Sequence, residues 1–213
     1  MTGPGTESLA LVRLSATLVG GAAGEVRAAM QAAHEDFSRL EVEETLLQSY
    51  LFLGYPAALN ALTMWRDLCG AQPGSAPPAD DPARWDERGE EVCRAVYGEQ
   101  YERLRASVRG LHPDLEAWMV TEGYGKVLGR PGLALEQREL CIVAMLAVQG
   151  EAVRRQLVSH LRGALNVGVG EDLVTRALEA ALERANPETA AVVRRIWQDV
   201  RQSYEARTPP SAH

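Results

Sequence analysis

The chain has few of the residues that carry redox or metal chemistry. Its 213 residues include only three cysteines and four histidines. Cys69, Cys93 and Cys141 form neither a Cys-x-x-Cys pair nor a zinc-binding pattern, and no two histidines stand at ligand spacing. We therefore expect reduced thiols, with Cys141 as an ordinary core residue. The sequence predicts no metal site and no cofactor.

The chain also lacks an excess of positive charge and a long apolar run. Its net charge is −7 at pH 7, which argues against a nucleic-acid partner because phosphates require a basic face. The apolar run at 142–148 is far shorter than the roughly 20 residues of a membrane span, so no membrane insertion is expected. The N-terminus lacks the basic-then-apolar order of a signal peptide, which makes the cytoplasm the expected location.

The apolar residues that are present recur at helical spacing, and strand-like alternation is not sustained anywhere. This periodicity predicts an all-α fold. We expect helices at residues 9–19, 24–36, 41–53 and 56–68 and, further along, at 85–97, 99–109, 113–128, 135–149, 151–167, 171–184 and 187–206.

A segment rich in proline and glycine, residues 70–84, interrupts the helical pattern. We interpret it as a linker between an N-terminal helical half (1–69) and a C-terminal half (85–207). Residues 208–213 would form a short tail, since two prolines stop the last helix.

A faint internal repeat relates the two halves. Three pairs of residues stand at a nearly constant offset: Gly21 and Gly150 at helix ends, Glu41 and Glu171 at helix starts, and Pro56 and Pro187 before alanine-rich helices. The pattern predicts two copies of a four-helix unit, the first of them degenerate. The alternative is chance similarity between amphipathic helices.

His160 is the first candidate for a functional side chain. It lies three residues after Leu157 and four before Ala164, so it borders the apolar stripe of its helix. Gly163 and Ala164 leave room beside the ring. On periodicity alone, the preferred interpretation is a histidine at the edge of the core that is bonded to a backbone carbonyl.

Glu139 is the second candidate. Ile142, Val143 and Leu146 follow it at helical spacing, so its carboxylate points along an apolar face where an unpaired charge is costly. A partner or a raised pKa is expected, and a carboxyl beside an imidazole is a workable acid–base unit. The alternative, equally supported, is a first-turn glutamate tied to Arg138 or Arg162.

Four sequence words in the second half resemble a known family. They are His-Pro-Asp-Leu-Glu-Ala-Trp (112–118), Glu-Gly-Tyr-Gly-Lys-Val-Leu-Gly-Arg-Pro-Gly-Leu (122–133), Gln-Arg-Glu-Leu (137–140) and Ser-His-Leu-Arg-Gly-Ala-Leu-Asn-Val-Gly (159–168). They resemble the carboxymuconolactone decarboxylase family, which includes the alkylhydroperoxidase-D-like proteins. The resemblance spans about Trp85 to Asp172.

The resemblance implies an alkylhydroperoxidase-D-like helical fold and assigns roles to particular residues. It implies that His160 and Glu139 are active-site residues. It places Tyr124 and Arg130 in a further family word, as pocket or structural residues. The redox branch of the family carries Cys-x-x-Cys-x-x-x-His, whose cysteine positions are Val153 and Gln156 here, so cysteine-based peroxide chemistry is disfavoured. The interval from Glu139 to His160 is longer than the family pattern, which puts their contact in question.

A family-like segment also occurs in the first half. Residues 46–62 resemble the helix pair that normally follows the histidine helix, whereas residues 179–190 have lost the aromatic-glycine word. Duplication with complementary loss would explain this order. It predicts a composite pocket to which the first half contributes Tyr55 and Asn60. The alternative is that Gly54 to Pro56 form only a tight corner between helices.

These observations favour a cofactor-free decarboxylase, or a related lyase or isomerase, acting on a small lactone or keto acid. His160 would be the acid, Glu139 would orient it, and Arg130 or Arg162 would hold a substrate carboxylate. One alternative is a non-catalytic helical oligomer or ligand-binding member of the same fold. A less favoured one is alkylhydroperoxidase or peroxiredoxin-like antioxidant activity.

The family resemblance further implies a homo-oligomer, a trimer or a trimer-based assembly. The broad apolar helix face from Leu46 to Leu53 would suit such an interface. A duplicated chain would need fewer copies to close the same assembly.

Overall fold

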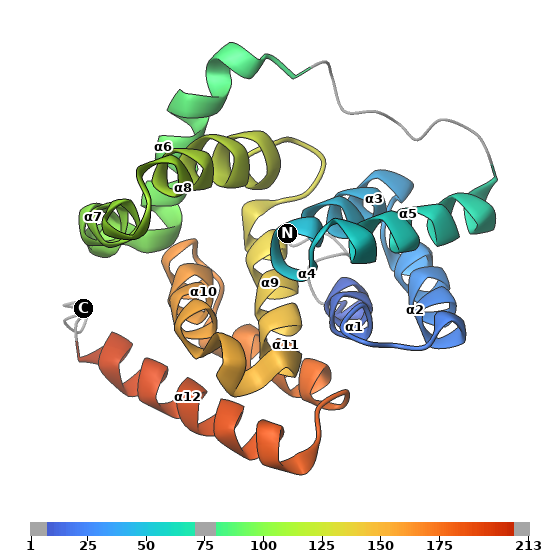
Figure 1. The fold of residues 1–213 in the computed structure, drawn as a ribbon. Coiled ribbons are helices and arrows are strands. Elements are labelled where there is room, and N and C mark those ends of the chain that lie inside the picture. The colour runs from blue at the N-terminus through green and yellow to red at the C-terminus, as the bar shows by residue number, and fades with distance from the viewer. Residues whose placement is uncertain (1–7, 71–79, 207–213) are drawn as a thin grey trace, which may run out of the picture.

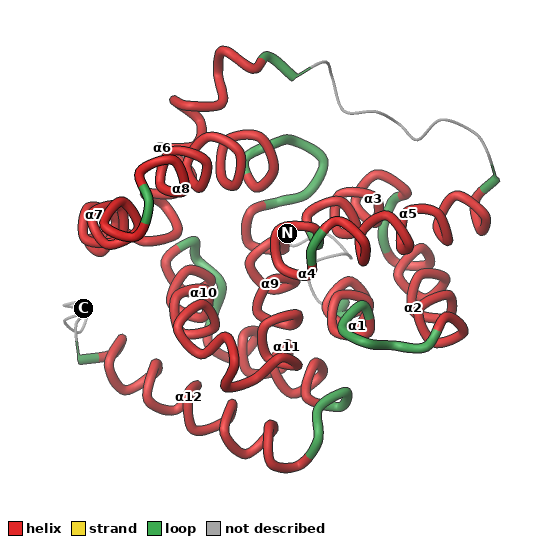
Figure 2. Tube along the Cα trace, viewed as in Figure 1, coloured by secondary structure: helices red, strands yellow, loops and turns green. Residues whose placement is uncertain are grey.

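The computed structural model describes residues 8–70 and 80–206, and within these ranges the chain is helical and contains no strand (Figure 2). The prediction of an all-α fold is confirmed. Most of the predicted linker (70–84) and the predicted tail (208–213) lie outside the described residues.

Except between α5 and η1, where residues 71–79 are not described, the helices follow one another with short connections (Figure 1). The N-terminal part contains α1 (Ala10–Thr17), α2 (Ala23–Asp36), α3 (Arg39–Gln48), α4 (Tyr50–Leu53) and α5 (Tyr55–Cys69). The C-terminal part contains η1 (Pro82–Arg84), α6 (Trp85–Tyr97), η2 (Gly98–Gln100), α7 (Tyr101–Leu111), α8 (Pro113–Trp118), η3 (Met119–Leu128), α9 (Leu135–Gln149), η4 (Gly150–Val153), α10 (Arg154–Asn166), α11 (Glu171–Leu182) and α12 (Pro187–Glu205).

Four of the expected helices are each built from two pieces. Those at 99–109 and 151–167 begin as the 3-10 helices η2 and η4 and continue as α7 and α10. The expected helix 41–53 is divided into α3 and α4 at Ser49, whose hydroxyl donates to the carbonyl oxygen of Leu46. The expected helix 113–128 begins as α8 and continues as η3, which has the wider π-helical turn. Periodicity at 3.6 residues per turn does not distinguish these cases from one continuous α-helix.

Helix α9 is the centre of the protein. Its residues 140–147 are all buried, because α1 packs on one side and α10, α11 and α12 cover the others (Figure 1). Most of these side chains join one hydrophobic cluster with the C-terminal helices, whereas Cys141 joins a second cluster formed by α1, α2, α3 and α5. Neighbouring residues of α9 therefore pack against different parts of the chain.

The apolar face from Leu46 to Leu53 lies against the protein itself. Leu46 is buried in the second cluster, and Leu51, Phe52 and Leu53 are half-buried against the first. Much of this face is therefore used within the chain.

The order of the helices is compatible with the predicted repeat. Helices α1, α2, α3 and α5 stand in the same order as α9, α10, α11 and α12, and Pro56 and Pro187 both lie at helix starts. The duplication itself stays a prediction.

Two glycines allow α6 and η3 to approach backbone to backbone. A Cβ atom at Gly125 would collide with the carbonyl oxygen of Trp85, and one at Gly89 would collide with that of Val120. The approach matters for the site described below, because α6 carries Tyr97 and η3 carries Tyr124.

We expect Gly125→Ala to lower the free energy of unfolding by at least about 1–3 kcal/mol, the range typical of overpacking. The added methyl group would collide with the backbone carbonyl of Trp85, which must move to admit it. Urea unfolding measures the change. Gly110→Ala on α7 is the matched control, because nothing lies within 4 Å of its added Cβ. Helix propensity predicts a gain of roughly 0.5–1 kcal/mol for the control. Equal unfolding midpoints for the two variants would contradict the close approach.

Candidate active site

Glu139 and His160 are in direct contact. The His160 Nδ1 and the Glu139 Oε2 are 2.9 Å apart, with Glu139 fully buried on α9 and His160 5% exposed on α10. They meet despite the longer interval between them in the sequence. The short helix η4 connects α9 to α10 within that interval. The partner of Glu139 is therefore His160 and not Arg138 or Arg162.

This contact sets the hydrogen-bonding state of the imidazole. An ionised carboxylate can only accept, so Nδ1 carries the proton of the bond and Nε2 is left for another molecule. The second oxygen of Glu139, Oε1, is buried and has no hydrogen-bond partner among the described residues. A buried polar atom of this kind is uncommon in structures and costly, which is typical of a functional site.

Gly163 makes room for the Glu139 carboxylate. A Cβ atom at position 163 would lie 2.7 Å from the Glu139 Oε2 and 2.7 Å from the Val96 Cγ1. The family-like word Arg-Gly-Ala-Leu-Asn (162–166) therefore contains a glycine that the carboxylate requires.

We expect Gly163→Ala to push Glu139 away from His160 and to lower stability by about 1–3 kcal/mol. The measurement is the downfield proton resonance of a carboxylate-bound imidazole N–H, which His160→Gln assigns by removing it. Gly24→Ala on α2 is the control, since its Cβ would meet nothing within 4 Å. An unchanged resonance in Gly163→Ala would show that the carboxylate does not need this space.

His160 faces a cavity of about 290 Å³. The lining comes from α4, α6, α8, η3 and α10, and it comprises Leu51, Phe52, Tyr97, Leu115, Trp118, Met119, Glu122, Gly123, Tyr124, Leu128 and His160. Glu139 is not part of the lining, so it sits behind the imidazole and is sealed from a bound molecule. No lysine or arginine belongs to the lining among the described residues.

The N-terminal part completes this cavity through α4. The ring of Phe52 stands edge-on to the His160 ring, with 5.5 Å between centroids, and Leu51 lies beside it in the lining. Both parts of the chain therefore line this cavity, with Phe52 and Leu51 contributing from the first part, whereas Tyr55 and Asn60 do not belong to its lining. The sequence signal for Phe52 and Leu51 was the apolar run before Gly54. Such a run is equally typical of ordinary core, so it did not identify them as cavity residues.

Two tyrosines meet at the wall of the cavity. The Tyr124 hydroxyl donates to the Tyr97 hydroxyl at 2.9 Å, and the Tyr97 ring lies 6.5 Å from the His160 ring between centroids. Burial raises the pKa of both tyrosines, and the nearby Glu139 charge adds to the shift. Both hydroxyls therefore stay protonated at neutral pH. Tyr124 was a candidate from the family resemblance, whereas Tyr97 was not singled out.

The remaining candidates lie elsewhere. Tyr55 is 63% exposed and stacks on Tyr50 outside the cavity, with 4.7 Å between ring centroids. Asn60 lines a different depression between α2 and α5. Arg162 donates to the Ser203 hydroxyl and also lines a separate depression. None of the three belongs to the lining of the cavity that His160 faces.

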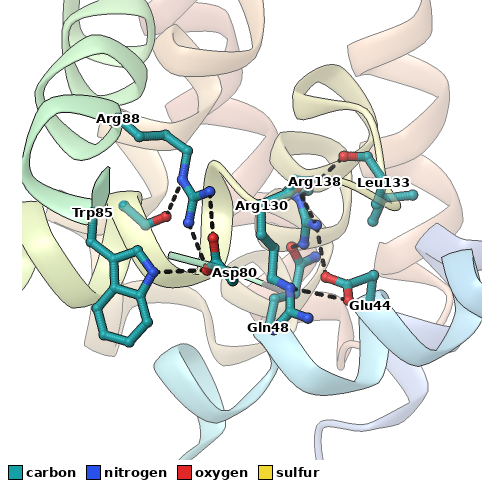
Figure 3. A network of polar contacts seen from close by, with 9 residues as sticks. Glu44, Gln48, Asp80, Trp85, Arg88, Arg130, Leu133 and Arg138 are labelled. Atoms are coloured by element: carbon teal, nitrogen blue, oxygen red, sulfur yellow. Dashed lines mark hydrogen bonds and ion pairs between the residues drawn. The ribbon is translucent and has the colours of Figure 1, made fainter. Parts of the chain in front are cut away.

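Arg130 belongs to a buried network on the other side of α9 (Figure 3). Its Nε lies 3.2 Å from Glu44 Oε1, while Arg138 Nη2 donates to Glu44 Oε2 at 2.8 Å. Arg138 also donates to Gln48 and to the carbonyl oxygens of Leu133 and Arg130. Burial lowers the pKa of Arg138, and the Glu44 carboxylate opposes that shift. Arg138 and Glu139 thus contact different neighbours of α9: Arg138 contacts Glu44 of α3, and Glu139 contacts His160 of α10.

The cysteines are not placed for redox chemistry. Burial raises the pKa of Cys93 to about 12 and that of Cys141 to about 11, so both are thiols at neutral pH. Cys69 is half-buried, and its pKa is also raised.

Within residues 8–70 and 80–206, no group of three potential ligands is arranged to bind a metal ion. No helix in the same ranges is long and apolar enough to cross a membrane.

Comparisons with known proteins point to one family. The model of the carboxymuconolactone decarboxylase family matches residues 113–199, a range that contains both Glu139 and His160. The chain is also similar to peroxisomal protein 2 of Schizosaccharomyces pombe. The two are 30% identical in an alignment of 149 residues, which covers 67% of this chain and 68% of that protein.

Proposed function

Because this chain belongs to the carboxymuconolactone decarboxylase family, we propose that it is a cofactor-free acid–base enzyme. The reaction class is decarboxylation, or a related lyase or isomerase reaction, on a small lactone or keto acid. The observation that carries the proposal is the buried Glu139–His160 pair, with the imidazole facing the cavity and the carboxylate behind it.

The pair is suited to moving one proton. Glu139 holds Nδ1, so Nε2 exchanges the proton with a bound molecule, and the carboxylate stabilises the imidazolium that results. In decarboxylation, the bond between the carboxylate carbon and the skeleton breaks and CO₂ leaves. The electron pair passes into an enolate, whose carbon then takes a proton from the His160 imidazolium. Solvent returns that proton, so the net reaction consumes one proton and releases CO₂.

The test measures CO₂ release by the purified chain from carboxymuconolactone and a panel of small β-keto acids. At least one compound is expected to lose CO₂ faster than in buffer, and His160→Gln and Glu139→Gln are expected to slow this reaction. Tyr55→Phe, which lies outside the cavity, is the matched control and should retain the wild-type rate. If no compound reacts faster than in buffer, or if His160→Gln matches wild type, the proposal is wrong.

The apolar lining of the cavity also supports a second candidate, a non-catalytic protein that binds an apolar ligand. Saturable ligand binding by both wild type and His160→Gln, without turnover by either, would favour it over the enzyme.

Antioxidant activity is the least supported candidate. It predicts peroxide turnover that disappears when Cys69, Cys93 and Cys141 are all replaced by serine.

We also propose a homo-oligomer, a trimer or a trimer-based assembly. Five large apolar side chains are exposed on the described surface: Tyr55, Leu59, Leu111, Leu115 and Trp118. We expect light scattering at micromolar concentration to give a multiple of 23.2 kDa, and Leu111→Lys to weaken the assembly. A monomer for the wild type under these conditions would contradict this prediction.

A further inference from the structure

We infer that Tyr97 is a catalytic residue that donates its hydroxyl hydrogen to the carbonyl oxygen of the substrate, with Tyr124 as its positioning residue. The substrate class is a carbonyl compound with an apolar skeleton. This inference rests on the proposed function for its role in turnover. The hydrogen bond itself can be tested by binding alone.

The tyrosine–tyrosine hydrogen bond uses one of the two phenol hydrogens and leaves the other for a ligand. Each phenol has one hydrogen to donate. Tyr124 is 4% exposed and gives its hydrogen to the more accessible Tyr97 at 2.9 Å. The Tyr97 hydrogen then has no acceptor among the hydrogen bonds found in the described residues, and its side chain lines the cavity. A hydroxyl that accepts one hydrogen bond also becomes a stronger donor of the next.

The position of Tyr97 matches the chemistry of the Glu139–His160 pair. Tyr97 comes from α6 and His160 from α10, and their rings stand 6.5 Å apart between centroids at one wall of the cavity. A carbonyl group and its neighbouring carbon can therefore lie between them, with the oxygen at the Tyr97 hydroxyl and the carbon at Nε2. When an enolate forms, the negative charge develops on the atom that Tyr97 contacts.

The charge state of the two tyrosines suits this role. Burial raises the pKa of Tyr97, and the neighbouring Glu139 charge raises it further, so the phenol remains a neutral donor. A neutral donor in an apolar cavity stabilises a developing oxyanion strongly, because little water competes for the bond. Loss of one such donor typically costs a factor of roughly 10²–10³ in kcat.

The other residues that line the cavity determine which substrate skeleton it favours. Six of the lining side chains are apolar: Leu51, Phe52, Leu115, Trp118, Met119 and Leu128. The one carboxylate in the lining, Glu122, is exposed to solvent and disfavours an additional negative group on the substrate there. The cavity therefore favours a compact, mainly apolar ring or chain that carries a carbonyl group.

The test uses acetophenone labelled with ¹³C at the carbonyl and isotope-edited infrared spectroscopy of the bound ligand. In wild type, we expect the bound carbonyl band at a lower wavenumber than in an alkane solvent, because a hydrogen bond weakens the C=O bond. Tyr97→Phe is expected to return the band to the alkane position while binding persists. Tyr124→Phe should give an intermediate position, and Tyr55→Phe, an exposed tyrosine outside the cavity, should match wild type.

The kinetic arm uses whichever compound loses CO₂ in the assay above. Tyr97→Phe is expected to lower kcat by roughly 10²–10³-fold with a much smaller change in KM, because the bond strengthens in the transition state. A purely structural role for Tyr97 would change the unfolding midpoint and would not produce this split between kcat and KM.

Several outcomes would overturn the inference. Acetophenone that does not bind wild type saturably, or a band that is unchanged in Tyr97→Phe, excludes Tyr97 as the donor. A band shift that is lost only in His160→Gln would assign the donor to His160 and would leave the proposed function intact. Conversely, a shift lost in Tyr97→Phe together with no turnover of any compound would keep the carbonyl site and reject the enzyme.

Discussion

Replacing His160 with glutamine is expected to lower kcat by about 10²–10⁴-fold, the usual contribution of a positioned general acid or base. Glutamine can donate to the Glu139 Oε2 as the imidazole does, so the buried carboxylate keeps a partner. It cannot exchange a proton near neutral pH. The loss should therefore appear in kcat with a small change in the unfolding midpoint, measured by CO₂ release and urea unfolding on the same preparation.

His160→Ala separates the catalytic role of the imidazole from its structural role. It leaves Glu139 fully buried without its hydrogen-bond partner, and an unsatisfied buried group costs roughly 1–3 kcal/mol, more when it is charged. We expect both variants to lose activity and only the alanine variant to lose substantial stability. If His160→Gln kept the wild-type rate, His160 would not transfer the proton.

Breaking the Arg138–Glu44 pair is expected to cost about 3–5 kcal/mol of unfolding free energy, because it leaves a buried charge without its partner. Arg138 is fully buried, and the Glu44 side chain is 3% exposed. Figure 3 shows the two side chains directed toward each other. Arg138→Met leaves Glu44 with Arg130 alone, and Glu44→Met leaves the Arg138 cation with only neutral acceptors. Urea unfolding of each variant gives the change.

The double variant Arg138→Met/Glu44→Met makes this prediction sharper. Replacing both members of a buried ion pair by apolar residues is often nearly neutral, since no desolvated charge remains. Arg130 is partly exposed and can turn to solvent. We expect the double variant to be more stable than either single variant. Arg201→Met, which removes an exposed ion pair with Glu171, is the control and should change stability by less than about 1 kcal/mol. Additive losses in the double variant would contradict the proposed coupling.

The helices were largely predictable because their signals are local. Pro56 and Pro187 lie at the starts of α5 and α12, and Gly150 ends α9 with a positive φ of 65°. The divisions at Ser49 and at the start of η3 were not predictable, since apolar periodicity is the same for a divided helix and a continuous one. Val153 and Gln156 occupy the two cysteine positions of the Cys-x-x-Cys motif. The sequence alone therefore disfavoured cysteine-based peroxide chemistry.

The candidate site was predictable only in part. Glu139 and His160 were identified from helical spacing together with the family resemblance, but their contact was uncertain because it depends on how η4 joins α9 to α10. Arg130 and Arg162 lie close to these residues in the sequence, yet Arg130, in the loop between η3 and α9, contacts Glu44, and Arg162, on α10, contacts Ser203. Sequence proximity is a poor guide here, because neighbouring positions on a helix point in different directions.

The sequence by itself determined that the chain is helical, that its family is the one resembled by residues 112–169, and that a cysteine pair is absent from the histidine helix. Only the tertiary structure decided which residues surround the His160 imidazole. Phe52 and Tyr97 are 108 and 63 residues away from it in the chain, and they meet it because α6 packs on α10 and α4 packs on the neighbouring α9. Helical periodicity specifies the face on which a side chain lies, whereas the partner of that face is selected by the packing of the whole core.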